Sequence, residues 1–124
     1  MDSSPARVLI VEDEPLIAMM IEDFCEEIGH EVTGAAETVA EALAATEAGG
    51  FDVAILDLHL RGDEQAWPVA DALDARGIPF VLATGGQIEP PPERHLDRIA
   101  LAKPFTMEGV RGAIEQALAT ATAP

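Results

Sequence analysis

The sequence predicts an α/β fold in which helical crossovers join the strands of a mostly parallel sheet. Short runs of branched apolar residues, each typical of a buried strand, alternate five times with longer amphipathic segments. This alternation favours a parallel sheet, because parallel neighbours need a connection of a dozen or more residues. The 124 residues, 13.1 kDa in mass, suffice for one compact domain with a single apolar core.

A strand over residues 7–11 and an amphipathic helix open the pattern. The helix is expected to start near Pro15, where a proline costs no backbone hydrogen bond, and to stop at Gly29. Its apolar residues recur at helical spacing: Leu16, Ile17, Met20, Ile21, Phe24 and Ile28. The acids between them therefore form a solvated face.

The next unit joins a weaker strand over 31–35 to a helix that begins near Val39. Thr38 and Glu41 stand three residues apart, a spacing that lets each side chain cap the other's backbone amide. The helix ends at the glycine pair 49–50. The residues expected to face inward are Val39, Ala40, Leu43 and Ala44.

The second half of the chain contains the remaining strands. Three are expected, over 53–57, 79–84 and 99–102. A helix from about Ala66 to Gly77 follows the first of them, and Thr106 caps the last helix of the chain. Residues 85–98 hold two glycines and three consecutive prolines, so any helix there must be short or irregular.

Charge and composition exclude several functional classes. The formal net charge of -16 repels nucleic acid phosphates and anionic lipid, so we expect no direct nucleic acid contact. No apolar run is long enough to cross a bilayer, and residues 1–5 contain no secretory signal, so a soluble, cytoplasmic protein is expected. The single Cys25 excludes an intramolecular disulfide and a cysteine-built metal site. A cation or a protein partner suits this charge balance better.

Polar side chains follow the predicted strands at the end where ligands bind to open parallel sheets. In chain order they are Glu12, Asp13, Asp57, Thr84 and Lys103. Because the carboxyl ends of parallel strands meet at one edge, we expect these side chains to converge. Each alone has an ordinary explanation as a turn, cap or helix-dipole residue. Their joint occurrence at the correct strand ends of one short chain predicts a functional site.

The residue types at this edge point to phosphoryl chemistry with a metal ion. Carboxylates a few ångströms apart oppose one another's ionisation, and a divalent cation would relieve that cost. A small set of oxygen ligands leaves room for water and a phosphoryl oxygen, which favours Mg²⁺. A carboxylate can attack phosphorus while the metal and Lys103 neutralise the developing charge. Thr84 could donate one further hydrogen bond.

The sequence resembles the receiver domains of two-component response regulators, from Arg7 to about Leu118. Three stretches carry the resemblance: Val8-Leu9-Ile10-Val11-Glu12-Asp13-Glu14, Val53-Ala54-Ile55-Leu56-Asp57-Leu58 and Leu101-Ala102-Lys103-Pro104-Phe105. The resemblance implies a five-stranded parallel sheet in 2-1-3-4-5 order with helices on both faces. It also implies a single receiver domain over residues 1–124, with no output domain.

The same resemblance implies a role for each residue of the predicted site. It makes Asp57 the phosphoacceptor, with Lys103 and Thr84 holding the phosphoryl oxygens. It assigns Mg²⁺ binding to Glu12, Asp13, Asp57 and the backbone carbonyl of His59. The implied donor is a phosphohistidine on a histidine kinase or a histidine phosphotransfer protein. The product, an aspartyl phosphate, would act by changing protein-protein contacts or by passing the phosphoryl group on.

One departure from the family concerns the response to phosphorylation. Ala100 stands where most receivers carry an aromatic residue that changes rotamer on activation, so this switch cannot operate here. The segment Pro79-Phe80-Val81-Leu82-Ala83-Thr84-Gly85-Gly86 is similar to the motif of the single-domain "FAT GUY" receivers, which also lack that aromatic. The similarity implies a bacterial network with kinases of the stress-response type. We expect Thr84 and the glycine-containing loop 85–98 to carry the response instead.

Two other functions stay open at this point. A phosphatase of the haloacid dehalogenase type also uses a nucleophilic Asp with Mg²⁺, but it needs an acid two residues later, where this chain has His59. The short chain also lacks room for a cap domain, so we do not expect an enzyme. A pseudo-receiver that binds a partner without being phosphorylated would keep the fold, although it would not need the complete set of site residues.

Overall fold

The computed structural model describes residues 6–57, 59–60, 64–84, 99–102 and 106–122. Its main sheet has five strands, all parallel, in the order β2-β1-β3-β6-β7. The strands are β1 (Arg7–Val11), β2 (Glu31–Ala36), β3 (Val53–Asp57), β6 (Phe80–Thr84) and β7 (Ile99–Ala102). Counted along the chain, this is the order 2-1-3-4-5 that the family resemblance implies. The predicted α/β fold is confirmed.

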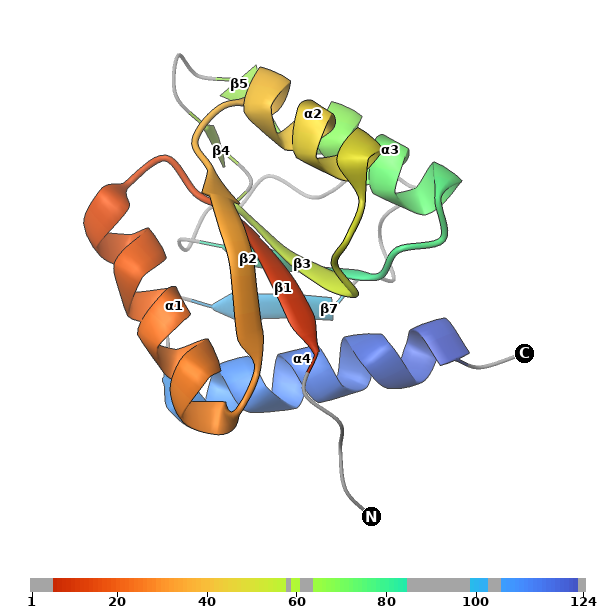
Figure 1. Ribbon diagram of the computed structural model, residues 1–124. Helices are drawn as coiled ribbons and strands as arrows, with labels where there is room; N and C mark the ends of the chain where they lie inside the picture. The colour runs from red at the N-terminus through yellow and green to blue at the C-terminus, as the bar shows by residue number, and fades with distance from the viewer. Residues whose placement is uncertain (1–5, 58, 61–63, 85–98, 103–105, 123–124) are drawn as a thin grey trace.

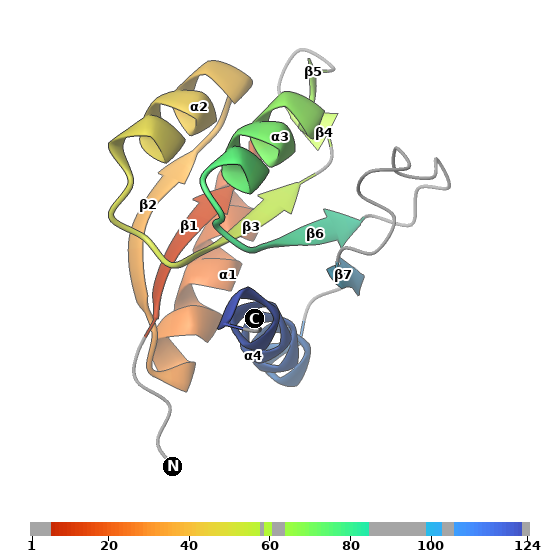
Figure 2. The ribbon, with the colours of Figure 1, turned by 90° about the vertical axis from the view of Figure 1, so that its right-hand side faces the viewer.

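Helices cover both faces of the sheet (Figures 1 and 2). One face carries α1 (Pro15–Ile28) and α4 (Met107–Thr122), and the other carries α2 (Val39–Ala48) and α3 (Trp67–Ala75). Successive side chains of each strand point to opposite faces of the sheet. Ile55 therefore packs with α1 and α4, and Leu56 packs with α2 and α3. No described helix is both long and apolar enough to cross a membrane.

The predicted start and stop signals act as expected at α1. Pro15 occupies the first helical turn, and Gly29 takes a left-handed backbone with φ of 111°. The backbone N–H groups of Gly29 and His30 donate to the Cys25 carbonyl at 3.1 and 2.8 Å, which closes the helix. Burial raises the pKa of the Cys25 thiol to about 12, so this cysteine packs as a small apolar residue.

Two expectations about buried helix faces were wrong. Leu16 was placed on the buried stripe of α1 but is 78% exposed, and three residues expected to face inward from α2, Ala40, Leu43 and Ala44, are exposed. Alanines make up half of α2, so its pattern does not define a face, and Ala42 and Thr46 are the residues that it buries. The Thr38 hydroxyl accepts the backbone N–H of Glu41 at 3.1 Å, as expected, but Glu41 accepts the backbone N–H of Glu37 at 2.9 Å, one residue before the expected Thr38.

Two features of the strands were not expected. A short antiparallel ladder joins β4 (His59–Leu60) to β5 (Glu64–Gln65) directly after the third strand of the main sheet. On β2, the partner of β1 shifts from Val32 to Gly34, which leaves Thr33 as an extra residue. The Thr33 hydroxyl lies 3.3 Å from the Val8 carbonyl and donates to it. The helix expected in 85–98 lies outside the described residues.

Candidate functional site

Three carboxylates meet at the carboxyl end of the sheet. Glu12 and Asp13 follow β1 directly, Asp57 is the last residue of β3, and the two strands are neighbours with Val11 aligned to Leu56. Glu12 therefore stands level with Asp57 on the adjacent strand. One oxygen of each carboxylate lies within 4.8 Å of the others. We call these three residues the acidic cluster.

Glu12 is held in place from two sides. Its backbone N–H donates to the carbonyl of Ala36 at 2.9 Å, which extends the pairing between β1 and β2 by one residue. Its carboxylate oxygen Oε2 accepts the backbone N–H of Glu14 at 3.2 Å. Glu14 precedes α1, so the same contact ties the carboxylate to the start of that helix. The fold thus fixes both the backbone and the side chain of Glu12.

Burial makes the acidic cluster electrostatically costly. Glu12 is 2% exposed and Asp57 8%, while Asp13 is half-buried. Two unit charges 4.8 Å apart repel one another by about 3 kcal/mol at the effective dielectric constant of a protein surface. A cation bound between the oxygens would convert this repulsion into attraction. The three carboxylates fit a hard, oxygen-preferring ion such as Mg²⁺ and leave coordination positions for other ligands.

The backbone of Thr84 reaches the same end of the sheet. Asp57 aligns with Ala83 on β6, and Thr84 is the next residue and the last of that strand. Thr84 in turn aligns with Ala102 on β7. Lys103, the residue after Ala102, lies outside the described residues, and only the backbone is described for Thr84 and His59. The structure therefore brings together the side chains of Glu12, Asp13 and Asp57 and places the Thr84 backbone beside them.

The β4–β5 ladder is the part of this region that sequence reasoning missed. It places the backbone of His59 opposite Gln65 within two residues of Asp57. Each strand contains two residues, which is too short for the alternating pattern that reveals longer strands. The backbone carbonyl expected to bind a metal therefore belongs to a paired strand rather than to an open loop.

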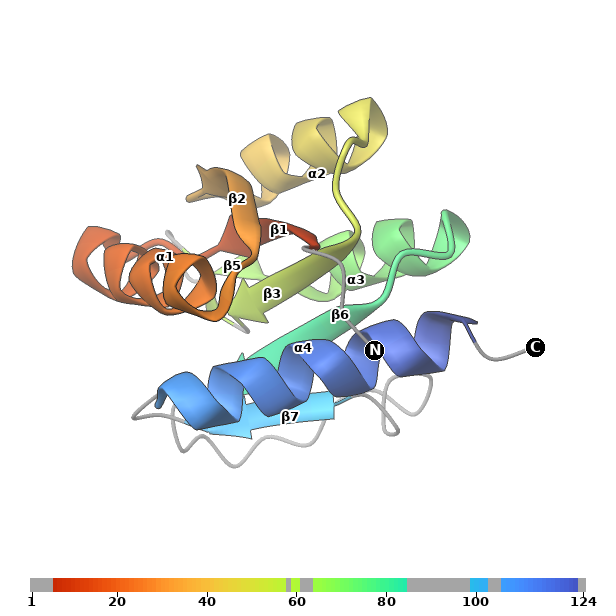
Figure 3. The same ribbon diagram turned by 60° about the horizontal axis from the view of Figure 1, so that its bottom comes forward.

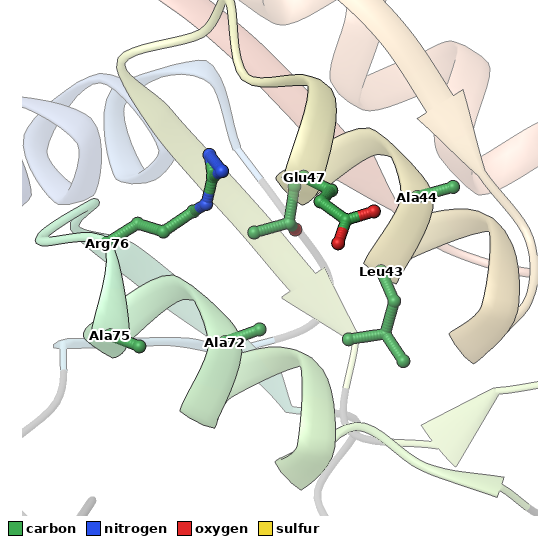
Figure 4. A pocket seen from close by; sticks show the side chains of 7 residues that line it. Leu43, Ala44, Glu47, Ala72, Ala75 and Arg76 are labelled. Atoms are coloured by element: carbon green, nitrogen blue, oxygen red, sulfur yellow. The ribbon is translucent and has the colours of Figure 1, made fainter.

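A groove elsewhere on the molecule contains none of the predicted site residues. It lies between α2 and α3, has a volume of about 570 Å³ and is lined by Leu43, Ala44, Thr46, Glu47, Ala72, Ala75 and Arg76 (Figure 4). Three of its seven lining residues are alanines, and Glu47 and Arg76 stand on opposite sides. The chemistry of the described residues is concentrated at the acidic cluster and not in this groove.

Comparison with known sequences identifies related proteins over most of the chain. A family model described as response regulator receiver domain matches residues 8–89. Phyllosphere-induced regulator PhyR of Methylorubrum extorquens is 36% identical over 120 residues, covering 90% of this chain and 43% of that protein. Transcriptional regulatory protein PdtaR of Mycobacterium tuberculosis is 32% identical over 117 residues, covering 92% and 57%. The chain spans about half the length of these curated relatives.

Solved structures of related proteins share the fold. The solution structure of SdrG from Sphingomonas melonis Fr1 has 52% sequence identity and a TM-score of 0.80, covering 98% of this chain and 100% of that one. A second SdrG structure, described as the BeF3-activated conformation, has 55% identity and a TM-score of 0.79, with coverage of 94% and 99%. The response regulator PhyR from Brucella abortus has 36% identity and a TM-score of 0.77, covering 94% and 49%.

Proposed function

We propose that this chain, which belongs to the response regulator receiver domain family, accepts a phosphoryl group on Asp57 from a phosphohistidine of a partner protein. The acidic cluster is the observation that carries the proposal. Asp57 is 8% exposed at the end of a central strand, with its oxygens within 4.8 Å of two other carboxylates. Mutual repulsion makes such a group of buried carboxylates favour cation binding, and arrangements of this kind are typical of functional sites.

In the proposed reaction, an oxygen of Asp57 attacks the phosphorus of the phosphohistidine. The new O–P bond forms as the P–N bond breaks, and the imidazole nitrogen takes up a proton as it leaves. Glu12, Asp13, Asp57 and the His59 carbonyl would hold Mg²⁺, which supplies positive charge for the phosphoryl oxygens. Thr84 and Lys103 would bind the remaining phosphoryl oxygens. Apart from the nucleophilic attack by Asp57, the chain would contribute only positioning and charge neutralisation.

Exposed apolar residues beside the acidic cluster support a protein donor. Leu16 is 78% exposed and Met19 52%, and their spacing of three places both on one side of α1. The helix begins three residues after Glu12, so its first turns lie at the same end of the sheet as the acidic cluster. We propose that the donor protein contacts Leu16 and Met19 while it presents its phosphohistidine to Asp57.

The relatives indicate the kind of pathway. One structure similar to this chain is described as anti-anti-sigma factor PhyR from Bartonella quintana, and another as the PhyR stress response regulator. We propose a bacterial stress-response pathway for this chain as well. The phosphorylated form would act by binding another protein or by passing the phosphoryl group to a histidine, because the net charge of -16 opposes direct contact with DNA.

The central experiment measures phosphorylation by mass. The protein is incubated with Mg²⁺ and acetyl phosphate or phosphoramidate, and its intact mass is recorded beside that of Asp57→Asn and of a matched control, Asp23→Asn, on α1. We expect a gain of one phosphoryl group in the wild type and the control and none in Asp57→Asn. Continuous turnover of the donor would indicate a phosphatase instead. No gain with small donors or any kinase would indicate a scaffold.

A second experiment separates donor docking from chemistry. Leu16→Asp and Met19→Asp should slow transfer from a cognate kinase by about tenfold or more and leave labelling by acetyl phosphate unchanged. Leu43→Asp is the control, because Leu43 is also exposed but lies on α2, on the opposite face of the sheet. Equal transfer to all three variants would place the donor contact elsewhere.

The response to phosphorylation should use the backbone around Thr84, since Ala100 provides no aromatic side chain. Ala100 aligns with Leu82 on β6, two residues before Thr84. We propose that the phosphoryl group draws Thr84 inward and reorders residues 85–98. Hydrogen exchange measured with and without beryllofluoride and Mg²⁺ tests this proposal. Unchanged protection in 85–98, together with a bound ligand, would show that the response takes another route.

A further inference from the structure

We propose that β2 and the hollow beside it bind an extended, basic segment of a partner protein, which adds a strand to the sheet. This site is distinct from the acidic cluster, and its use does not require phosphorylation of Asp57. Three features of the structure carry the proposal: the unpaired edge of β2, the shape of the hollow and the charge around it.

The first feature is the edge of the sheet. In the described part of the chain β2 pairs with β1 alone, so the backbone groups on its outer side have no strand partner. Natural edge strands usually carry charged residues or prolines in their middle, but residues 32–35 of β2 are Val, Thr, Gly and Ala. Thr33 and Ala35 are exposed. An extended peptide could therefore reach this edge and pair with its backbone.

The bulge at Thr33 does not prevent an added strand from pairing with the edge of the sheet. A bulge twists its strand and often guards an edge against unwanted pairing. Here the extra residue lies near the start of β2, and Gly34, Ala35 and Ala36 keep regular register with β1 after it. Pairing with an added strand is therefore available over the second half of β2, where the hollow lies.

The second feature is a hollow of about 470 Å³ between β2 and α2. Figure 3 shows α2 above this edge of the sheet. Gly34 and Ala36 line it from the strand, and Ala45 and Ala48 line it from the helix, so small side chains on both sides leave the space between them open. Leu9 and Phe51 contribute apolar surface to its wall. A side chain of an added strand could fill this space.

Gly34 is not required by the local backbone. Its φ is not among the positive values found at Gly29, Gly49, Gly50 and Gly77. A Cβ atom added to it would meet no heavy atom within 4 Å. A Cβ atom would therefore fit at this position without strain. The missing side chain leaves space in the hollow that the fold itself does not use.

The third feature is negative charge around the hollow. Glu41 lines it, and Glu31 is exposed at the start of β2. The whole chain carries a net charge of -16, so a second copy of the protein would be repelled at this edge. A segment that carries lysine or arginine beside small apolar residues would instead be attracted. The charge therefore favours a basic partner over self-association.

The test uses a fluorescent decapeptide of alternating valine and lysine and its binding measured by anisotropy. We expect binding to the wild type and to Asp57→Asn alike, with protection of backbone amides in 34–36 from hydrogen exchange. A peptide of the same sequence with N-methyl groups on alternate residues cannot complete the ladder and should bind about tenfold more weakly or worse. Equal binding of both peptides would show simple charge attraction and overturn the proposal.

Two variants complete the design. Gly34→Val fills the hollow and should weaken binding of the unmodified peptide by about tenfold or more, with the fold retained. Gly112→Val is the matched control, because Gly112 lies on the exposed side of α4 and also has open space around it. Equal affinities of the two variants, or no binding to the wild type, would overturn the proposal. A wild-type dimer that Gly34→Val abolishes would show that a second copy occupies the edge instead.

Discussion

Polar side chains at the two ends of the central sheet have opposite kinds of neighbours. At the amino end, Asp52 accepts the backbone N–H of Arg7 at 2.8 Å and faces its guanidinium at 3.5 Å, and His30 accepts the backbone N–H of Ala6 at 3.0 Å. At the carboxyl end, Glu12, Asp13 and Asp57 crowd within 4.8 Å. The side chains of the first group accept hydrogen bonds from backbone N–H groups and so stabilise the fold. Repulsion among the carboxylates of the second group favours the binding of a cation.

The largest effect that can test this contrast is at the acidic cluster. Asp13→Asn should lower Mg²⁺ affinity by about tenfold or more, because it would remove one of the proposed charged ligands. The same change should raise the free energy of unfolding by about 1 kcal/mol in metal-free buffer, because it relieves repulsion. Quenching of Trp67, the single tryptophan, and urea unfolding measure the two quantities. A destabilised variant in metal-free buffer would contradict the contrast.

An intermediate effect of opposite sign is expected at the amino end. Asp52→Ala should lower the free energy of unfolding by about 1 kcal/mol, chiefly through loss of the bond to the Arg7 backbone. The ion pair adds less, because Arg7 and Asp52 are 51% and 41% exposed and solvent screens their attraction. Asp52→Asn is the control, because its amide oxygen can still accept the Arg7 backbone N–H.

The pH dependence gives an independent check on Asp52. The Arg7 backbone N–H, and to a smaller extent its guanidinium, holds the pKa of Asp52 below the usual 3.8. Its contribution is therefore present above pH 3.8 and is lost as the pH falls through the lower pKa of the folded state. The stability difference between wild type and Asp52→Ala should shrink in that range. A difference that stays constant with pH would assign the effect to packing.

The smallest effect concerns His30. Desolvation lowers its pKa below 6.5, against an opposing contribution from Glu115 on α4. The neutral ring accepts the Ala6 N–H, so protonation favours the unfolded chain, and stability should be complete above pH 6.5 and decline below it. His30→Gln keeps an acceptor without titrating. Urea midpoints of the two proteins should therefore diverge on acidification, and parallel curves would show that His30 does not contribute.

The elements of this fold were predictable where the pattern was strong. The Pro15 start and Gly29 stop of α1 follow from backbone geometry that few residues can adopt, and both were read correctly. The exposure of Leu43 was not predictable, because the alanines around it give no periodic signal and only the packed neighbours decide which side is buried. The β4–β5 ladder was too short to leave a pattern.

The candidate site also has features that the sequence predicted and features that it could not predict. Strand ends alone predicted that Glu12, Asp13 and Asp57 would converge, because parallel strands deliver their last residues to one edge. Their separations and the two contacts that fix Glu12 depend on the register of β1 with β2 and on the start of α1, which the sequence does not show. The functional roles of these three residues, and those of Thr84, Lys103 and the His59 carbonyl, stay predictions.

The direction of the chain at its two ends has a practical consequence. Since α4 runs back toward the amino end of the sheet, where β1 begins, the start of β1 and the end of α4 both lie on the side away from the acidic cluster (Figure 1). An affinity tag or a fluorescent protein fused at either terminus would leave the approach to Asp57 clear. The same layout suits modular recombination, as in Brucella abortus PhyR, where the matching part makes up 49% of a longer chain.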